Sequence, residues 1–164
     1  MIRERLERDV PLLVQVLEAI DETRTVDWLV GPAERSWVFD QAPVTVAPTR
    51  NVIGHVQVCR ADRLEAASGV VPSRTGEDRC LVVGRLFVRP GAAAGNIARF
   101  LLRESVRFVH AQGCAAILEP WSREALPGGA AARSGFSEVT TGDGAVLVSA
   151  PPTAQPQASD TRSA

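Results

Sequence analysis

Lysine and tyrosine are absent from this sequence of 164 residues, and cysteine is scarce. All 18 basic residues are therefore arginine, and they stand against 19 acidic residues, for a formal net charge of -1. A chain without a basic excess lacks the electrostatic attraction that non-specific nucleic-acid binding requires. No apolar run approaches the roughly 18 residues of a membrane span, and the residues from Met1 to Arg5 do not resemble a secretory signal. The sequence predicts a cytoplasmic protein that binds neither nucleic acid nor membrane.

The three cysteines, Cys59, Cys80 and Cys114, are far apart in the sequence and odd in number. Each lies in an apolar, strand-like segment, which is typical of buried, reduced thiols and not of a disulfide framework. The chain contains no Cys-x-x-Cys pair of the kind that structural zinc sites use, so no metal site is predicted.

The composition predicts one folded domain followed by a tail. Hydrophobic residues make up 45% of the chain and charged residues 23%, which is enough apolar surface for a core. We assign the domain to residues 1–150, interrupted by a long polar connector at 61–79. Residues 151–164 are rich in Pro, Ser, Ala and Gln, and they predict a disordered tail.

Hydrophobic periodicity predicts alternating strands and helices. Strands are expected at 2–5, 44–46, 52–58, 81–88, 115–119, 136–140 and 145–149. Helices are expected from a cap at Asp9 to Ile20, at 32–39, from about Asn96 to Gln112 and at 130–134, with a helical turn at 62–67. The strand–helix–strand order within 81–119 makes its two strands parallel and indicates an α/β domain.

The connection between that first strand and its helix has the features of an anion site. Residues 89–96 form a turn of small residues, so a phosphate can approach the backbone closely. The helix that follows offers unpaired N–H groups and a positive dipole end, and Arg99 adds a charge in its first turn. A tight connection without a ligand explains the same residues equally well. The turn has neither the Gly-Lys-Ser/Thr of a P-loop nor the G-x-G-x-x-G of a dinucleotide site.

The residues from Leu86 to Leu102 resemble the acyl-CoA-binding motif of the GNAT N-acetyltransferases. The later run from Ala130 to Val139 resembles the closing helix of that superfamily and its Gly-Phe entry into the sixth strand. The resemblance covers roughly residues 1 to 150, including the order of the elements. It implies an α/β (α+β) fold with a mixed, splayed sheet of six to seven strands and about four helices.

The resemblance also implies a cofactor site between the fourth and fifth strands. Acetyl-CoA would be the acyl donor, with Leu86, Phe87 and Val88 offering backbone groups to the pantetheine arm. The pyrophosphate loop of the family corresponds here to Ala93, Ala94, Gly95, Asn96, Ile97 and Ala98, followed by Arg99. Two positions depart from the family pattern, because Ala93 replaces Arg or Gln and Asn96 replaces the central Gly.

Catalysis in this superfamily usually needs a proton acceptor for the amine and a proton donor for the thiolate. The Tyr that many members use as the acid corresponds to Ala131, and Ser122 and Ser134 are substitutes supported only by proximity. Glu119, at the end of the fifth strand, is the candidate catalytic residue. It would act as base or as an anchor for a cationic substrate, and a solvated carboxylate before Pro120 is the simpler interpretation.

The acceptor implied by the resemblance is a primary amine of a small molecule or protein. Candidate pocket walls are Trp28, Trp37 and Trp121, and candidate cation binders are Asp27, Glu34 and Glu119. His55 is interpreted as a packed core histidine and His110 as an exposed one. Two alternatives stay open: an inactive acyl-CoA-binding or interaction module on the same fold, and an unrelated α/β nucleotide binder. The resemblance also allows a homodimer.

Overall fold

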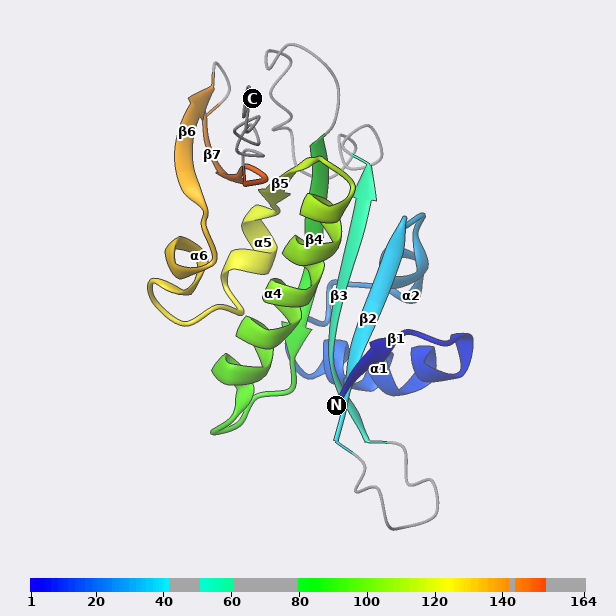
Figure 1. The fold of residues 1–164 in the computed structure, drawn as a ribbon. Helices are drawn as coiled ribbons and strands as arrows, with labels where there is room; N and C mark the ends of the chain where they lie inside the picture. The colour runs from blue at the N-terminus through cyan, green and yellow to red at the C-terminus, as the bar shows by residue number, and fades with distance from the viewer. Residues whose placement is uncertain (42–50, 61–79, 142–143, 153–164) are drawn as a thin grey trace, which may run out of the picture.

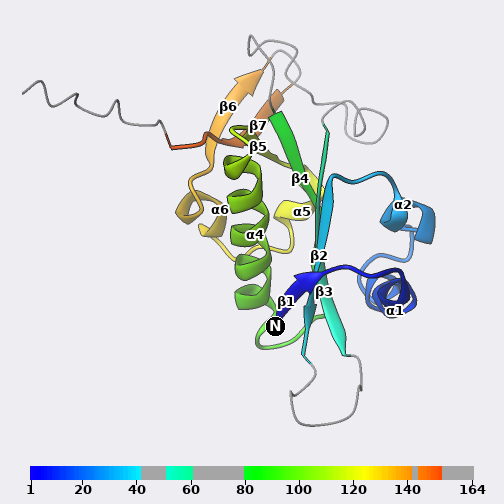
Figure 2. The same ribbon diagram turned by 45° about the vertical axis from the view of Figure 1, so that its right-hand side comes forward.

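The computed structural model describes residues 1–41, 51–60, 80–141 and 144–152. They form one seven-stranded sheet in the order β1-β2-β3-β4-β5-β7-β6, with helices on both faces (Figures 1 and 2). The strands are β1 (Ile2–Glu4), β2 (Arg35–Asp40), β3 (Val52–Arg60), β4 (Cys80–Val88), β5 (Ala115–Leu118), β6 (Ser137–Thr141) and β7 (Gly144–Ser149). The helices are α1 (Val10–Glu18), α2 (Val26–Val30), α4 (Ala94–Ala111), α5 (Pro120–Arg123) and α6 (Ala130–Arg133), with a 3-10 turn at Glu7–Asp9.

The sheet is mixed, as the resemblance implied. Strands β1 to β4 are antiparallel to one another, β4 and β5 are parallel, and β5, β7 and β6 are again antiparallel. Pairing of β4 with β5 begins at Cys80 and Ala115 and ends at Val83 and Leu118, although β4 continues to Val88. The two strands therefore separate over the second half of β4.

One face of the sheet is covered by α4, which begins after the turn at Gly91 and ends before Gly113. Its buried residues recur at helical spacing and form one stripe: Ile97, Ala98, Leu101, Leu102, Ser105, Val106 and Val109. This stripe packs on residues of β3 and β4, among them Val56, Val58, Val83 and Leu86. The long helix seen beside β4 in Figure 1 thus holds the larger core.

The opposite face is covered by α1 and α2. Leu13, Val16 and Leu17 of α1 and Leu29 of α2 are buried against Val38, Val52 and Phe87 of the sheet. Figure 2 shows these two helices on the side of the sheet away from α4. No helix within the described ranges is both long enough and apolar enough to cross a membrane.

The helix expected at 32–39 is wrong. The helix in this region is α2, which ends at Val30 and is capped by the Thr25 hydroxyl, the acceptor of the Trp28 N–H. Residues Arg35–Asp40 form strand β2 instead. Side chains of β2 alternate between the two faces, with Trp37 toward α4 and Val38 toward α1. The strand expected at 44–46, the turn at 62–67 and residues 153–164 of the expected tail lie outside the described residues.

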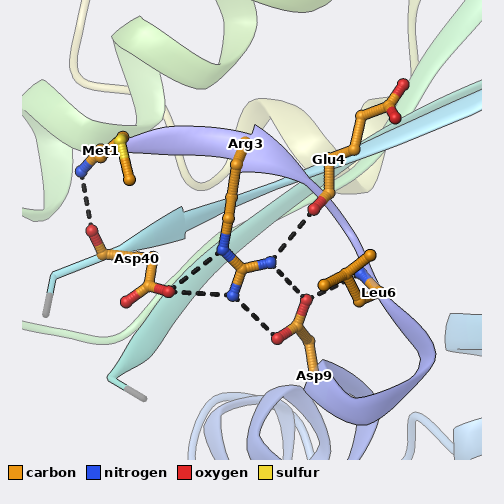
Figure 3. Close-up of polar contacts among 6 residues, drawn as sticks. All are labelled: Met1, Arg3, Glu4, Leu6, Asp9 and Asp40. Atoms are coloured by element: carbon orange, nitrogen blue, oxygen red, sulfur yellow. Dashed lines mark hydrogen bonds and ion pairs between the residues drawn. The ribbon is translucent and has the colours of Figure 1, made fainter. Parts of the chain in front are cut away.

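Asp9 stands at the start of α1, but its carboxylate does not cap that helix as expected. Instead it accepts the N–H of Leu6 at 2.8 Å and two hydrogen bonds from the Arg3 guanidinium at 2.7 and 2.9 Å (Figure 3). The same guanidinium reaches Asp40 of β2 at 2.9 Å. Burial alone would raise the pKa of Asp9, but the contacts with Arg3 and Leu6 outweigh it and hold the pKa below its usual value. These bonds tie β1, β2 and α1 together.

Candidate functional site

A cavity of about 360 Å³ opens where β4 separates from β5. Its walls are the end of β4, the start of α4, helix α5 and the turn after α1. The lining residues are Ile20, Asp21, Leu86, Phe87, Val88, Pro90, Ala94, Trp121, Glu124 and Ala125. Four of the ten residues predicted to hold the cofactor, Leu86, Phe87, Val88 and Ala94, therefore lie on this cavity.

The backbone of β4 faces the cavity with groups that β3 does not use. The N–H of Arg89 donates to the carbonyl of Ile53 on β3 at 2.7 Å. Because hydrogen bonds to one neighbour alternate along an antiparallel strand, the N–H of Val88 points away from β3. It therefore points toward the side from which β5 has withdrawn.

The first turn of α4 is closed by its own hydrogen bonds. The N–H of Ala94 donates to Gly91 O, and those of Asn96 and Ile97 donate to Ala93 O, at 3.0 to 3.1 Å. The side chains of Ile97 and Ala98 are buried in the core under α4, so they are not available to a ligand. Arg99 is exposed on the helix surface.

Gly95 lies in this turn against the loop that follows α5. A Cβ atom built on it would lie 3.3 Å from Cγ of Pro127, so a larger side chain would press on that loop. The close approach accounts for a glycine at this position.

Glu119 is buried, with 6% of its surface exposed, and the interpretation as a solvated carboxylate is wrong. Its Oε2 accepts the N–H of Arg85 and the hydroxyl of Ser122, both at 2.7 Å. The Ser122 hydroxyl in turn accepts the N–H of Leu86 at 3.0 Å. The side chains of Glu119, which follows β5, and of Ser122 in α5 thus satisfy the N–H groups of Arg85 and Leu86 on β4.

Arg85 sits at a β-bulge in β4. The register pairs His55 with Phe87 but Gln57 with Gly84, so β4 carries one extra residue there. Arg85 adopts a φ of 50°, a conformation uncommon for a residue with a Cβ atom. Its guanidinium donates to Gly31 O at 3.3 Å and lies 5.4 Å from the ring centroid of Trp28.

His55 is fully buried beside this bulge, which confirms its interpretation as a core histidine. Its Nδ1 lies 2.9 Å from Arg85 O, and its Nε2 lies 3.3 Å from Nη1 of Arg5. A carbonyl can only accept and a guanidinium can only donate, so the proton is on Nδ1 and the ring is neutral. Burial lowers the pKa of His55 to about 3, and the nearby Arg5 and Arg85 charges act in the same direction.

The structure brings together two of the three predicted tryptophans. Trp28 and Trp121 meet edge to face with centroids 4.9 Å apart, and Arg24 lies 5.1 and 5.3 Å from their centroids. Trp37 is on the opposite face of the sheet, packed on Phe108 at 5.4 Å, and shares no wall with them. Because β2 was taken for a helix, the alternation that separates Trp37 from the others was missed.

The remaining candidates are scattered. Asp27 and Glu34 are exposed, and the Ser134 hydroxyl donates to Ala130 O at 3.0 Å within α6. Ala131 packs partly buried against the core under α4. Sequence reasoning gave Arg85 no role, and no motif marks it, because its position depends on the bulge.

No family model matches the chain, and no curated protein matches it in sequence. Solved structures do match, and they define the class of fold, which is that of the GNAT N-acetyltransferases. One is the GNAT family N-acetyltransferase YhbS from Escherichia coli in complex with CoA. It has 19% identity and a TM-score of 0.58, and the match covers 92% of this chain and 80% of that one.

Two further solved structures have the same fold. NAA60 from Arabidopsis thaliana in complex with acetyl-CoA has 17% identity and a TM-score of 0.60, over 92% of this chain and 98% of that one. The aminoglycoside 6'-N-acetyltransferase from Enterococcus faecium has 10% identity and a TM-score of 0.62, over 95% and 99%. At these identities the likeness establishes the fold.

Proposed function

We propose that this chain transfers an acetyl group from acetyl-CoA to a primary amine. The observation that carries the proposal is the cavity beside the end of β4 that does not pair with β5, with β4 residues on its wall and a buried carboxylate, Glu119, hydrogen-bonded to the adjacent Arg85 N–H. Two of the solved structures with this fold hold CoA or acetyl-CoA, which supports the same ligand here. The groups present fit that ligand, because an extended pantetheine can pair with a strand that lacks a neighbour.

Each residue then has a defined task. Leu86 to Val88 hold the pantetheine arm, with the N–H of Val88 as a donor that β3 does not use, and the thioester lies toward the Leu86 end, near Glu119. Glu119 accepts a proton from the substrate ammonium, directly or through one water. The amine nitrogen forms a bond to the acyl carbon while the carbon–sulfur bond breaks, and the nitrogen releases its second proton to water. With no tyrosine in the chain, CoA leaves as a thiolate, which is feasible because ordinary thiols have a pKa near 8.5.

The proposal is tested by calorimetric titration with acetyl-CoA and with CoA, followed by release of CoA thiol in the presence of a panel of primary amines. We expect saturable binding of both and amine-dependent thiol release. Binding without amine-dependent release would identify a non-catalytic acyl-CoA module. Binding of ATP or NAD in place of CoA would contradict the proposal.

Replacing Gly95 by Val is expected to weaken CoA binding by roughly tenfold or more, because the added side chain presses on Pro127 and crowds the backbone that faces the diphosphate. Calorimetry with CoA measures the change. Gly128→Val is the matched control, since a Cβ atom there meets nothing within 4 Å. Equal affinities of Gly95→Val and the parent chain would place the phosphates elsewhere.

Replacing Ala93 by Arg is expected to tighten CoA binding by about fivefold, on the order of 1 kcal/mol, because it adds a charge at an exposed position beside the diphosphate. The gain should shrink as salt is added, since exposed charges are screened. Ala132→Arg, exposed on α6, adds the same charge away from the cavity and should leave the affinity unchanged. No gain at low salt would contradict the assignment of the phosphate loop.

A further inference from the structure

The β4 backbone is already occupied just past the Leu86 end of the cavity. The Ser122 hydroxyl accepts the N–H of Leu86 at 3.0 Å, and the Glu119 carboxylate accepts the preceding N–H, that of Arg85, at 2.7 Å. The β4 residues on the cavity wall are Leu86, Phe87 and Val88. A ligand that lies along these residues therefore cannot continue past Leu86 by pairing with the strand.

Trp121 lines the cavity close to this end. It precedes Ser122 in α5, and its ring meets that of Phe87 edge to face with centroids 6.3 Å apart. One short helix thus carries both the hydroxyl that occupies the β4 backbone and the indole beside it. A chain that extends past Leu86 would have to displace one of the two.

The Trp121 ring is held by contacts with side chains of other elements. Trp28 of α2 meets it edge to face with centroids 4.9 Å apart, and the Arg24 guanidinium lies 5.3 Å from its centroid and 5.1 Å from that of Trp28. Edge-to-face pairs and cations within about 6 Å of a ring centroid are both attractive arrangements. A change of the Trp121 rotamer would break these contacts, so the indole is a fixed part of the cavity wall.

Arg24 is itself fixed by the turn after α1. Its Nε lies 3.3 Å from Oδ2 of Asp21, which also lines the cavity. The other oxygen of Asp21 accepts the N–H of Thr23 at 3.0 Å and the Thr23 hydroxyl at 2.5 Å. These hydrogen bonds hold the pKa of Asp21 below its usual value, so the carboxylate is ionised beside Arg24. The turn and α5 are therefore joined across Arg24 and the two indoles.

The cavity leaves little space beyond what the pantetheine arm needs. Its volume is about 360 Å³, near the lower end of the roughly 300–1,000 Å³ that is usual for ligand cavities. In the proposed complex the arm lies along Leu86 to Val88 and the thioester lies toward the Leu86 end. The acyl group then meets the Trp121 ring, which leaves room for a short chain.

We propose that Trp121, held in place by Arg24 and Trp28, restricts the donor to short acyl groups such as acetyl. This inference rests on the proposed acetyl transfer, for which it names the residue that selects the donor. Trp121 is a specificity residue, because its ring faces the acyl group. Arg24 does not line the cavity and is a positioning residue that acts through the indole.

Calorimetric titration with acetyl-CoA and with hexanoyl-CoA tests the proposal without any turnover. We expect the parent chain to bind hexanoyl-CoA roughly tenfold or more weakly than acetyl-CoA, since a single methylene that a pocket cannot hold has an effect of that size. In Trp121→Ala the two affinities should differ by about threefold or less, because the longer chain occupies the space of the indole. A parent chain that binds both donors equally would overturn the inference and leave the acetyl-CoA site in place. A parent chain that binds neither would remove the proposed function as well.

The ratio of the two affinities separates donor selection from packing. If Trp121 only supports α5, Trp121→Ala weakens both donors equally and keeps the parent ratio, which would overturn the inference. Trp121→Leu keeps an apolar side chain in the core and should also lower the ratio. Phe100→Ala removes an aromatic ring that is 45% exposed on α4, so it is the matched control and should keep the parent ratio.

Replacing Arg24 by Met tests the positioning role. Methionine keeps most of the length of the side chain but removes the charge that holds the two indoles. We expect a ratio between those of the parent chain and Trp121→Ala, with the affinity for acetyl-CoA close to that of the parent. A parent-like ratio in Arg24→Met would show that the indole is held without Arg24 and would overturn this part of the inference.

Discussion

We expect the free energy of unfolding to fall by about 3 kcal/mol between pH 6.5 and pH 4, because His55 must remain neutral in the folded chain. Its Nε2 accepts from Arg5 and its Nδ1 donates to Arg85 O, so a second proton would replace a hydrogen bond by a contact between two cations. The pKa of His55 is about 3 in the folded chain, against about 6.5 when unfolded.

The sign follows from proton binding. Between these two pKa values the unfolded chain binds a proton at this residue and the folded chain does not, so lowering the pH favours unfolding. The contribution is complete above pH 6.5 and is lost progressively toward pH 3. The lowered pKa of Asp9 changes the free energy of unfolding mainly below the ordinary Asp pKa of 3.8. Measurements above pH 4 therefore report chiefly on His55.

Urea unfolding at a series of pH values measures this effect, and His55→Gln is the test variant. Glutamine can donate to Arg85 O and accept from Arg5, but it does not titrate, so the slope between pH 4 and 6.5 should decrease. The chain has one other histidine, and His110→Gln is the matched control for the loss of an imidazole. A parent chain equally stable at both pH values would show that His55 is not buried as a neutral ring.

Replacing Glu119 by Gln is expected to lower kcat for acetyl transfer by roughly 10²–10³-fold, in the range of general-base contributions. The amide oxygen can still accept the N–H of Arg85, so the bulge and the cavity wall are retained. Glutamine, however, cannot accept a proton from the substrate ammonium. The KM for acetyl-CoA should therefore remain close to that of the parent chain.

Steady-state kinetics with separate variation of acetyl-CoA and amine distinguish the possible roles of Glu119. A base lowers kcat, whereas an anchor for the ammonium raises the KM for the amine. Glu124→Gln is the matched control, because Glu124 is an exposed carboxylate on the same cavity. A parent-like kcat and amine KM in Glu119→Gln would remove Glu119 from the reaction. Turnover of the parent chain should rise with pH without an alkaline decrease, since the chain supplies no tyrosine acid.

The unit from β4 to β5 could be predicted from the sequence because local signals agree there. An apolar strand, a turn of small residues and an amphipathic helix follow one another, and the parallel pairing of Val83 with Leu118 confirms the crossover. The segment 32–39 was misread because Trp37, Val38 and Phe39 are consecutive hydrophobic residues. Such a short apolar run fits a strand or a helix equally well, and only pairing with β3 decides between them.

The site was harder to predict than the fold because its contacts join residues distant in sequence. Sequence position placed Glu119 at the end of β5, but its burial depends on Gly84 and Arg85, more than thirty residues earlier. The complete burial of Gln57 has no signal in the sequence at all. From the sequence alone, a glutamine within an apolar strand is expected at the surface, because the helices that cover that face of the sheet are not yet known.

The side-chain hydrogen bonds of Glu119 and Ser122 to β4 have a consequence for ligand entry. Where two strands separate, their unpaired backbone N–H and C=O groups normally need hydrogen bonds from water or from each other, which favours closure of the gap. Here the Glu119 carboxylate and the Ser122 hydroxyl accept the β4 N–H groups that a neighbouring strand would otherwise bind. The separation of β4 from β5 is therefore stable without a ligand. Binding then needs no free energy to part the strands, and the association rate of the ligand should reflect diffusion into an open slot and not a preceding conformational step.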